Sequence, residues 1–321
     1  MARYPSTVMV SIVCPWDDDE RLDEAIFRRA IQHALTGGFR HLYVFGTAGE
    51  GYAVDSARFR RVVEVFGDEL AGSDAHPTVG VIGMSTAAVV ERLAVAHALG
   101  FRAFQISLPS WSVPTDGEVV TYFESVCSAF PDSTFMHYNT ARVGRLVDGP
   151  LYAEIVDRVP NLVATKTMTG DLGVVAGVVR DAPELMHFLT EQSIAYGGLF
   201  GDVALLGTFA ALAPERSWAL LDAVRGGRHG EAAGIGSWFA ALNETIFAPL
   251  MVDRRVDGAY DKTIERLAPG MGDFPLRMLS PYRTISEAEF EGALSTLRER
   301  FPELAAGLGS PAAGNAAALD R

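Results

Sequence analysis

The sequence predicts a (β/α)8 TIM barrel, an α/β fold, followed by a C-terminal helical extension. Short β-branched or aromatic segments alternate strictly with amphipathic segments over residues 1–214. Such alternation indicates parallel strands joined by crossover helices. Seven or eight of these units fit into this part of the chain, which favours a closed barrel over an open sheet. The length of 321 residues suits one barrel with an extension.

The expected elements follow one another without a separating linker. Each strand is a short apolar run, and each helix is the longer amphipathic stretch behind it. The expected strands are 8–13, 41–45, 78–82, 103–107, 134–138, 162–166, 185–189 and an eighth near 200–205. The expected helices are 20–36, 55–71, 85–99, 115–129, 149–158, 171–180 and a short one near 193–197.

The pattern changes after Pro214, where only helical periodicity continues. This change divides the chain into a barrel over 1–214, a helical extension over 215–308 and a tail over 309–321. The tail is small, polar and contains Pro and Gly, so we expect it to be disordered. The expected helices of the extension are 215–228, 230–252, 258–269 and 286–307.

Composition excludes several classes of function. Hydrophobic residues make up 49% of the chain and charged residues 21%, as expected for a globular protein. The net charge of −13 argues against nucleic-acid binding, which needs clustered basic surface. Apolar runs such as 7–15 are too short for a membrane span and no basic segment precedes them, so we expect a cytoplasmic protein without a membrane partner. The two cysteines are expected as buried thiols.

Lysine is nearly absent: of 27 basic residues other than histidine, only Lys166 and Lys262 are lysine. Lys166 ends an expected apolar strand, and in this fold catalytic groups lie at the carboxyl ends of strands. Burial there lowers the pKa of an amine and favours attack on a ketone to form a Schiff base. The alternative is a structural lysine paired with a carboxylate. Lys262 has Glu265 three residues further on an expected helix, and we expect it to be solvated.

Two further polar groups are expected at the same rim. Tyr138 ends the preceding strand, about 5 Å from Lys166 across adjacent strands, and suits proton transfer; the alternative is a rim tyrosine without chemistry. The loop Gly46-Thr-Ala-Gly-Glu-Gly51 offers backbone N–H groups for a carboxylate, or is only a tight turn. Its Thr47 hydroxyl is placed to bond Tyr138. His137 is expected to face the helices. No metal-ligand motif is present, so neither metal nor cofactor is expected.

Together, the motifs Gly46-Thr-Ala-Gly-Glu50, Tyr138-Asn139 and Lys166-Thr-Met-Thr-Gly170 resemble the dihydrodipicolinate synthase/N-acetylneuraminate lyase superfamily of class I aldolases, in order and in spacing. The resemblance covers roughly residues 5–305. It implies that Lys166 forms the Schiff base, that Tyr138 moves protons, and that Thr47 with the Ala48 amide holds a 2-oxoacid carboxylate. It also implies substrate contact by Asn139.

Departures from the synthase pattern concern the second substrate. Ala48 replaces a threonine, and Trp111 stands where a synthase sends a tyrosine across a dimer interface, although an indole cannot relay a hydroxyl proton. The arginine that binds the second substrate's carboxylate matches Arg142 only with a one-residue gap. The segment around Trp111 is similar to hydratase-aldolases that cleave aromatic benzylidenepyruvates; the alternative is an interface or packing aromatic. Glu191 lies where lyases of the superfamily bind substrate hydroxyls.

We therefore expect a metal-independent Schiff-base lyase that acts on pyruvate or a related 2-oxoacid and an aldehyde, with hydration or dehydration as in hydratase-aldolases. The alternatives are condensation of the dihydrodipicolinate synthase type, a sugar-acid lyase or dehydratase, and a barrel that binds a 2-oxoacid without turnover. The resemblance further implies a homo-oligomer, either a dimer or a tetramer.

Overall fold

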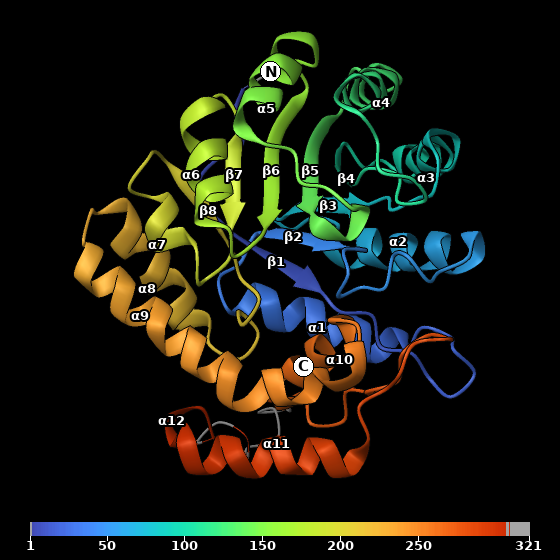
Figure 1. Cartoon of the computed structure of the whole chain (residues 1–321). Helices are drawn as coiled ribbons and strands as arrows, with labels where there is room; N and C mark the ends of the chain where they lie inside the picture. The colour runs from blue at the N-terminus through green and yellow to red at the C-terminus, as the bar shows by residue number, and fades with distance from the viewer. Residues whose placement is uncertain (1, 306–307, 309–321) are drawn as a thin grey trace, which may run out of the picture.

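The computed structural model describes residues 2–305 and 308. Eight parallel strands form a closed barrel in chain order, and helices surround it (Figure 1). The predicted fold class is therefore confirmed. The strands are β1 (Val8–Ile12), β2 (His41–Val44), β3 (His76–Gly80), β4 (Ala103–Ile106), β5 (Thr134–Thr140), β6 (Leu162–Met168), β7 (Met186–Leu189) and β8 (Val203–Leu206).

The helices of the barrel lie close to their predicted positions. The first six begin at Asp, Ser or Thr residues whose side-chain oxygens accept a hydrogen bond from a backbone N–H of the first turn, which defines where each helix starts. The helices are α1 (Glu24–Thr36), α2 (Ser56–Leu70), α3 (Thr86–Ala98), α4 (Asp116–Ser128), η1 (Ala141–Val143), α5 (Gly149–Arg158), α6 (Leu172–Asp181), α7 (Ile194–Gly197) and α8 (Pro214–Arg225).

Side chains fill the interior of the barrel. Inward-facing residues from six of the eight strands form one apolar cluster, so the barrel is a packed core with its site at one end. The cluster consists of Met9, Tyr43, Met136, Ala164, Met186, Phe188, Ala204 and Leu206. The register of β5 and β6 pairs Tyr138 with Lys166 directly, as their strand-end positions predict.

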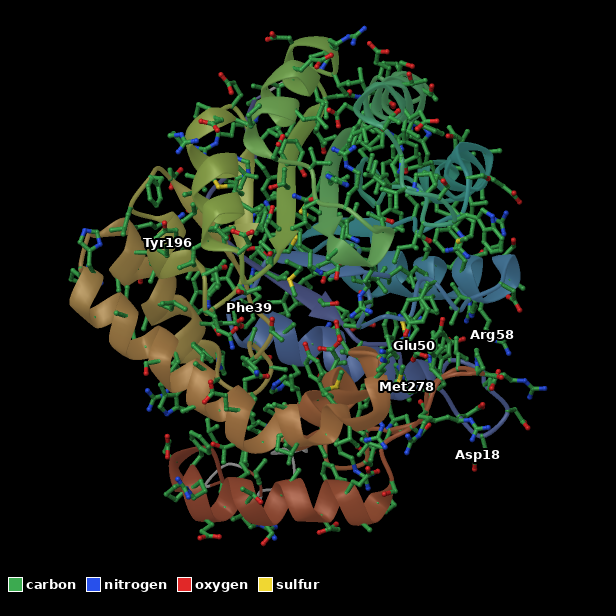
Figure 2. All side chains as sticks on the ribbon, in the orientation of Figure 1. Asp18, Phe39, Glu50, Arg58, Tyr196 and Met278 are labelled. Atoms are coloured by element: carbon green, nitrogen blue, oxygen red, sulfur yellow. The ribbon has the colours of Figure 1, made fainter. Side chains whose placement is uncertain are left out.

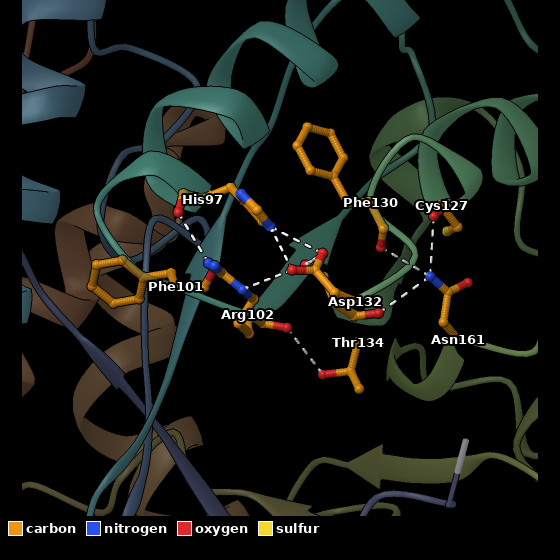
Figure 3. Close-up of polar contacts among 9 residues, drawn as sticks. His97, Phe101, Arg102, Cys127, Phe130, Asp132, Thr134 and Asn161 are labelled. Atoms are coloured by element: carbon orange, nitrogen blue, oxygen red, sulfur yellow. Dashed lines mark hydrogen bonds and ion pairs between the residues drawn. The ribbon is translucent and has the colours of Figure 1, made fainter.

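Polar contacts fix the opposite, amino-terminal face of the barrel. Asn161 precedes β6, and its side-chain nitrogen donates to the carbonyl oxygens of Cys127, Phe130 and Ser133 at 3.0–3.3 Å (Figure 3). Asp132, in the same loop, pairs with Arg102 at 3.0 Å. These contacts hold the starts of β5 and β6 in position. The pairing shifts between Phe135 and Met136, and beyond this shift Tyr138 lies beside Lys166.

The chain after β8 is helical. Its elements are α9 (His229–Leu242), η2 (Asn243–Phe247), η3 (Ala248–Arg254), α10 (Gly258–Leu267), α11 (Glu287–Arg300) and α12 (Pro302–Ala305). The sequence assigned α8 to the extension, but α8 contacts β1 and β8 and takes the place of the eighth barrel helix. The stretch His229–Val252 has the length and apolar composition of a membrane span; here it packs against α7, α8 and α11. The expected disorder of 309–321 lies outside the described residues.

Candidate active site

Lys166 lies near the carboxyl end of β6 with its side chain inside the mouth of the barrel. The residue is only 3% exposed. Its Nζ donates a hydrogen bond of 2.5 Å to the Tyr43 hydroxyl and lies 4.1 Å from the centre of the Tyr138 ring. Burial in this aromatic setting lowers the pKa of Lys166, because desolvation destabilises the charged ammonium more than the neutral amine. Among the described residues, no carboxylate lies within ion-pair distance of this nitrogen.

Tyr138 is buried on β5 beside Lys166. Its hydroxyl lies 3.1 Å from the Thr47 Oγ1, so the hydrogen bond expected from the sequence is present. The Thr47 hydroxyl can pass a proton along this contact because each oxygen can either donate or accept. The neighbouring His137 faces outward, where its Nδ1 lies 2.6 Å from the hydroxyl of Tyr152 on α5.

The glycine-rich loop after β2 brings Thr47 and Ala48 to the cavity. Within it, the amides of Glu50 and Gly51 bond back to the carbonyls of Thr47 and Gly46. The glycines of this loop have negative φ, so they are not required for a left-handed conformation. They are required because the loop packs closely against the backbone of Phe45: a Cβ on Gly49 would lie 2.7 Å from the Phe45 nitrogen. The left-handed residues of this turn are Phe45 and Glu50.

A cavity of about 40 Å³ adjoins the Lys166 amine. Because one water needs roughly 10–15 Å³, the space holds a few waters or a small keto group that displaces them. The barrel contributes Tyr43, Thr47, Ala48 and Tyr138 to its wall. The other side of the wall comes from α10 and the residue before it, with Asp257, Tyr260, Asp261, Ile264 and Glu265.

A wider cavity of about 340 Å³ shares Thr47 and Tyr138 with the first and lies toward the rim. Its other walls combine apolar and aromatic residues with polar and charged ones. The first group is Ile82, Leu108, Val143, Val256, Tyr52 and Tyr282, and the second includes Ser107, Ser110, Thr140, Arg254 and Arg255. The two tyrosine rings meet edge to face, 4.9 Å apart. Arg142 also lines this cavity, but its guanidinium forms an ion pair with Asp257. Asp257 therefore occupies part of the Arg142 guanidinium that could otherwise bind a substrate carboxylate.

A buried ion pair holds α10 against the glycine-rich loop. Lys262 Nζ lies 2.9 Å from Glu50 Oε1, and both side chains are fully buried. Lys262 also donates to the Cys14 carbonyl, while Glu50 accepts from the Trp16 indole and the Leu279 amide. Figure 2 labels Glu50 beside Met278, where the chain after α10 crosses this loop. The expectation of a solvated Lys262 is wrong, because its helix face packs on the barrel mouth.

Three of the expected substrate-binding residues are placed away from the two cavities. Trp111 is 88% exposed in the loop after β4. The Asn139 side chain bonds both the N–H and the carbonyl of Val147 and holds the loop before α5. Glu191 is buried and accepts from the Phe209 amide at 3.0 Å; burial raises its pKa to about 7. By contrast, Thr47, Ala48, Tyr138, Arg142 and Lys166 all line one or both cavities.

The structure adds residues that the sequence analysis did not select. Tyr43 lies two residues after the start of β2, and strand alternation from the inward-facing positions would have identified it. Asp257, Asp261 and Glu265 are spaced four residues apart, which places them on one face of a helix. That spacing was visible in the sequence, but the packing of this helix over the barrel mouth was not.

Within the described part of the chain, no group of three or more His, Cys, Asp or Glu side chains is arranged to hold a metal ion. The cavity presents an amine, hydroxyls and carboxyls. These groups can form an imine and move protons.

Comparisons with known proteins agree with this geometry. The model of the dihydrodipicolinate synthetase family matches residues 4–256. The 4-hydroxy-tetrahydrodipicolinate synthase of Methanopyrus kandleri is 24% identical over 245 residues, which cover 75% of this chain and 81% of that protein. The enzyme of the same name from Moorella thermoacetica is 24% identical over 246 residues, with 75% and 82% covered.

Solved structures share the fold. YagE, a prophage protein of the dihydrodipicolinic acid synthase family from E. coli K12, was solved in complex with pyruvate; it aligns with a TM-score of 0.80 at 17% identity, covering 92% of this chain and 98% of that one. Proteus mirabilis N-acetylneuraminate lyase aligns with a TM-score of 0.78 at 18% identity, with 92% and 98% covered. The family match extends over the whole barrel and includes all three motifs, and members of the family are Schiff-base lyases. The chain therefore belongs to the dihydrodipicolinate synthetase family.

Proposed function

We propose that the protein is a class I aldolase that joins or cleaves pyruvate, or a related 2-oxoacid, and an aldehyde through an imine on Lys166. The observation that carries the proposal is the buried Lys166 amine at the end of β6, next to the Tyr138–Thr47 hydroxyl pair and a small cavity. A lysine in such a setting holds its free-amine form more readily than one in water, and the free amine is the nucleophile.

The reaction follows from the positions of these groups. The 2-oxoacid carboxylate rests on the loop at Thr47 and Ala48, which points the keto carbon toward the Lys166 nitrogen. Tyr138 moves protons as water leaves and the imine forms, and again when C3 loses its proton to give the enamine. The enamine carbon then adds to an aldehyde in the wider cavity. Acid–base catalysis by a positioned phenol supplies about 10²–10⁴-fold in rate.

The wider cavity bears on the second substrate. The apolar and aromatic part of its wall favours an aldehyde with an apolar or aromatic group, which supports the hydratase-aldolase alternative; Arg254 and Arg255 lie in the same wall, and Arg255 is paired with Glu289. The contact with such a group is assigned to the Tyr52–Tyr282 pair, because Trp111 lies outside this cavity in a single chain. The engagement of Arg142 by Asp257 weakens the case for an acidic aldehyde of the synthase type. The position of Glu191 likewise weakens the case for a sugar-derived one.

The test uses the scarcity of lysine. The protein is incubated with pyruvate, reduced with borohydride and mapped by mass spectrometry; we expect the added mass on the Lys166 peptide. Lys262 is the internal control, since it is the only other lysine and is buried in an ion pair. Label on Lys262, or no label, would overturn the proposal, and Lys166→Arg is expected to abolish labelling. Turnover of aromatic, acidic and sugar-derived aldehydes then separates the substrate classes, and imine formation without turnover of any would favour a binding protein.

A further inference from the structure

The wall of the Lys166 cavity that comes from α10 carries carboxyl groups. Asp257, immediately before α10, and Asp261, one turn later, both line this cavity, and Glu265 follows after another turn. Their spacing of four residues puts them on the helix face that covers the barrel mouth. The mechanism above uses Tyr138 and leaves these groups without a role.

The three carboxyl groups differ in what they contact. Asp257 is the ion-pair partner of Arg142. Glu265 lies a full turn deeper and also borders a separate cavity against α1. Among the described residues no cation lies within ion-pair distance of Asp261, although it shares the cavity with the Lys166 amine. Asp261 is thus a carboxyl group without an ion-pair partner among the described residues that lines the same cavity of about 40 Å³ as the reacting nitrogen.

We propose that Asp261 is the proton partner of Lys166, a second catalytic acid–base group alongside Tyr138. The inference rests on the proposed function, because it assigns a residue to the imine-forming step of that reaction. Asp261 accepts a proton from the ammonium through a cavity water or the substrate, which leaves a neutral amine and a neutral carboxylic acid. No proton has to cross to bulk solvent.

The bonds and charges of the step balance. The amine nitrogen bonds to the keto carbon while the Asp261 acid gives its proton to the keto oxygen; the carboxylate then takes a proton back from the nitrogen, which leaves a neutral carbinolamine. The acid next protonates the hydroxyl, the C–O bond breaks, water leaves and the nitrogen lone pair completes the C=N bond. The products are a positively charged imine, one water and a carboxylate that serves as its counter-ion.

Desolvation favours the neutral forms of both groups, the Lys166 amine and the Asp261 carboxylic acid. Burial lowers the pKa of Lys166, whereas burial, followed by repulsion from Asp257, raises the pKa of Asp261. Both shifts favour transfer of the proton from the Lys166 nitrogen to the Asp261 oxygen. The titratable or charged groups that interact electrostatically with Asp261 are Tyr43 from β2, Tyr52 from the loop after β2, Lys166 from β6, Arg142 from η1, and Asp257, Tyr260 and Glu265 from its own segment. Tyr138 from β5 lines the same cavity.

The test measures how fast the pyruvate imine forms as a function of pH. Enzyme and pyruvate are mixed for a set time between pH 5 and 9.5 and then quenched with borohydride at one fixed pH. We expect Asp261→Asn to form the imine at least tenfold more slowly at the wild-type optimum. We also expect it to lose the limb on which the rate falls as pH rises, because that limb reports loss of the acid's proton. A purely structural role would leave the shape of the pH profile unchanged.

Three further variants make the test decisive. Asp261→Ser removes the acid with a smaller side chain, so it decides the question if Asp261→Asn does not fold. Asp261→Glu keeps a carboxyl and is expected to retain the two-limbed profile. Asp273→Asn, a surface carboxylate paired with Arg29, is the matched control and is expected to behave as the wild type.

The outcomes separate this inference from the function on which it rests. A folded Asp261→Asn or Asp261→Ser protein with the wild-type rate and profile would overturn the role of Asp261 alone. An equal loss of the rate of imine formation in Asp261→Glu would also overturn it, since the size of the side chain rather than its carboxyl group would then explain the loss. Failure of the wild type itself to label Lys166 would overturn the proposed function and this inference together.

Discussion

Replacing Lys262 with methionine tests the ion pair that holds α10 over the site. The pair with Glu50 is fully buried at 2.9 Å, and the substitution keeps most of the side-chain volume while it removes the charge. The Glu50 carboxylate then keeps its Trp16 and Leu279 donors but loses its only cation among the described residues. The Cys14 carbonyl also loses a donor.

Breaking a buried pair by removing one partner costs about 3–5 kcal/mol, because an uncompensated charge stays in a low-dielectric site. We expect a loss of this size in the free energy of unfolding of Lys262→Met, measured by urea unfolding followed by circular dichroism. The double variant Glu50→Gln with Lys262→Met removes both charges. It should recover about 1–4 kcal/mol relative to the single variant, since no buried charge is then left unpaired.

The same variants show whether this pair positions the loop that carries Thr47 and Ala48. We expect slower pyruvate trapping on Lys166 in Lys262→Met even where the protein is fully folded, because α10 and the loop are no longer tied together. A loss of unfolding free energy below about 1 kcal/mol in the single variant, with no recovery in the double variant, would refute the reasoning that this pair is a desolvated link between the extension and the barrel.

Four further outcomes follow from the structure. Tyr138→Phe should lower steady-state turnover about 10²–10⁴-fold while Lys166 still labels with pyruvate, checked by kinetics and peptide mapping. Trp111→Ala should change the rate of pyruvate imine formation by less than about twofold, in the same trapping assay, because the indole is exposed outside both cavities and makes none of the acid–base contacts. Gly80→Ala should cost about 3 kcal/mol or more of unfolding free energy, since its Cβ would lie 2.2 Å from the Phe45 carbonyl oxygen; an unchanged urea midpoint would contradict this. Burial raises the pKa of Glu191 to about 7, so the native state keeps a proton that the unfolded chain loses near pH 4.5; stability therefore falls by up to about 3 kcal/mol as pH rises from 4.5 to 7, and Glu191→Gln should flatten that fall in pH-dependent urea unfolding.

The sequence predicted the barrel because its signals are local. The alternation of apolar runs with amphipathic stretches reports strand and helix periods directly, so each element is predicted from residues that are close together in the sequence. The β5–β6 pair also followed from local information: consecutive strands are neighbours in a parallel barrel, so Tyr138 and Lys166 had to meet. The contact between Thr47 and Tyr138 was predicted because both residues lie at the carboxyl ends of strands and therefore at the same rim of the barrel.

The contribution of the extension to the site was not predictable in this way. Lys262 was interpreted as a surface lysine from a neighbour three residues away, whereas its partner Glu50 lies more than two hundred residues earlier in the chain. No local period reports which face of α10 meets the barrel. Substrate contact by Trp111 and Glu191 stays a prediction. In the single chain the Trp111 side chain is exposed, and Glu191 accepts from the Phe209 amide.

The chain by itself therefore determined the barrel, the strand ends and the lysine amine at the rim, because hydrophobic periodicity and strand order depend on residues that are close together in the sequence. Only the tertiary structure decided which carboxyl groups face that amine, which arginine is already paired and how much room a substrate has. Those properties depend on how a distant helix packs over the barrel mouth, and on the burial that this packing imposes on each charge.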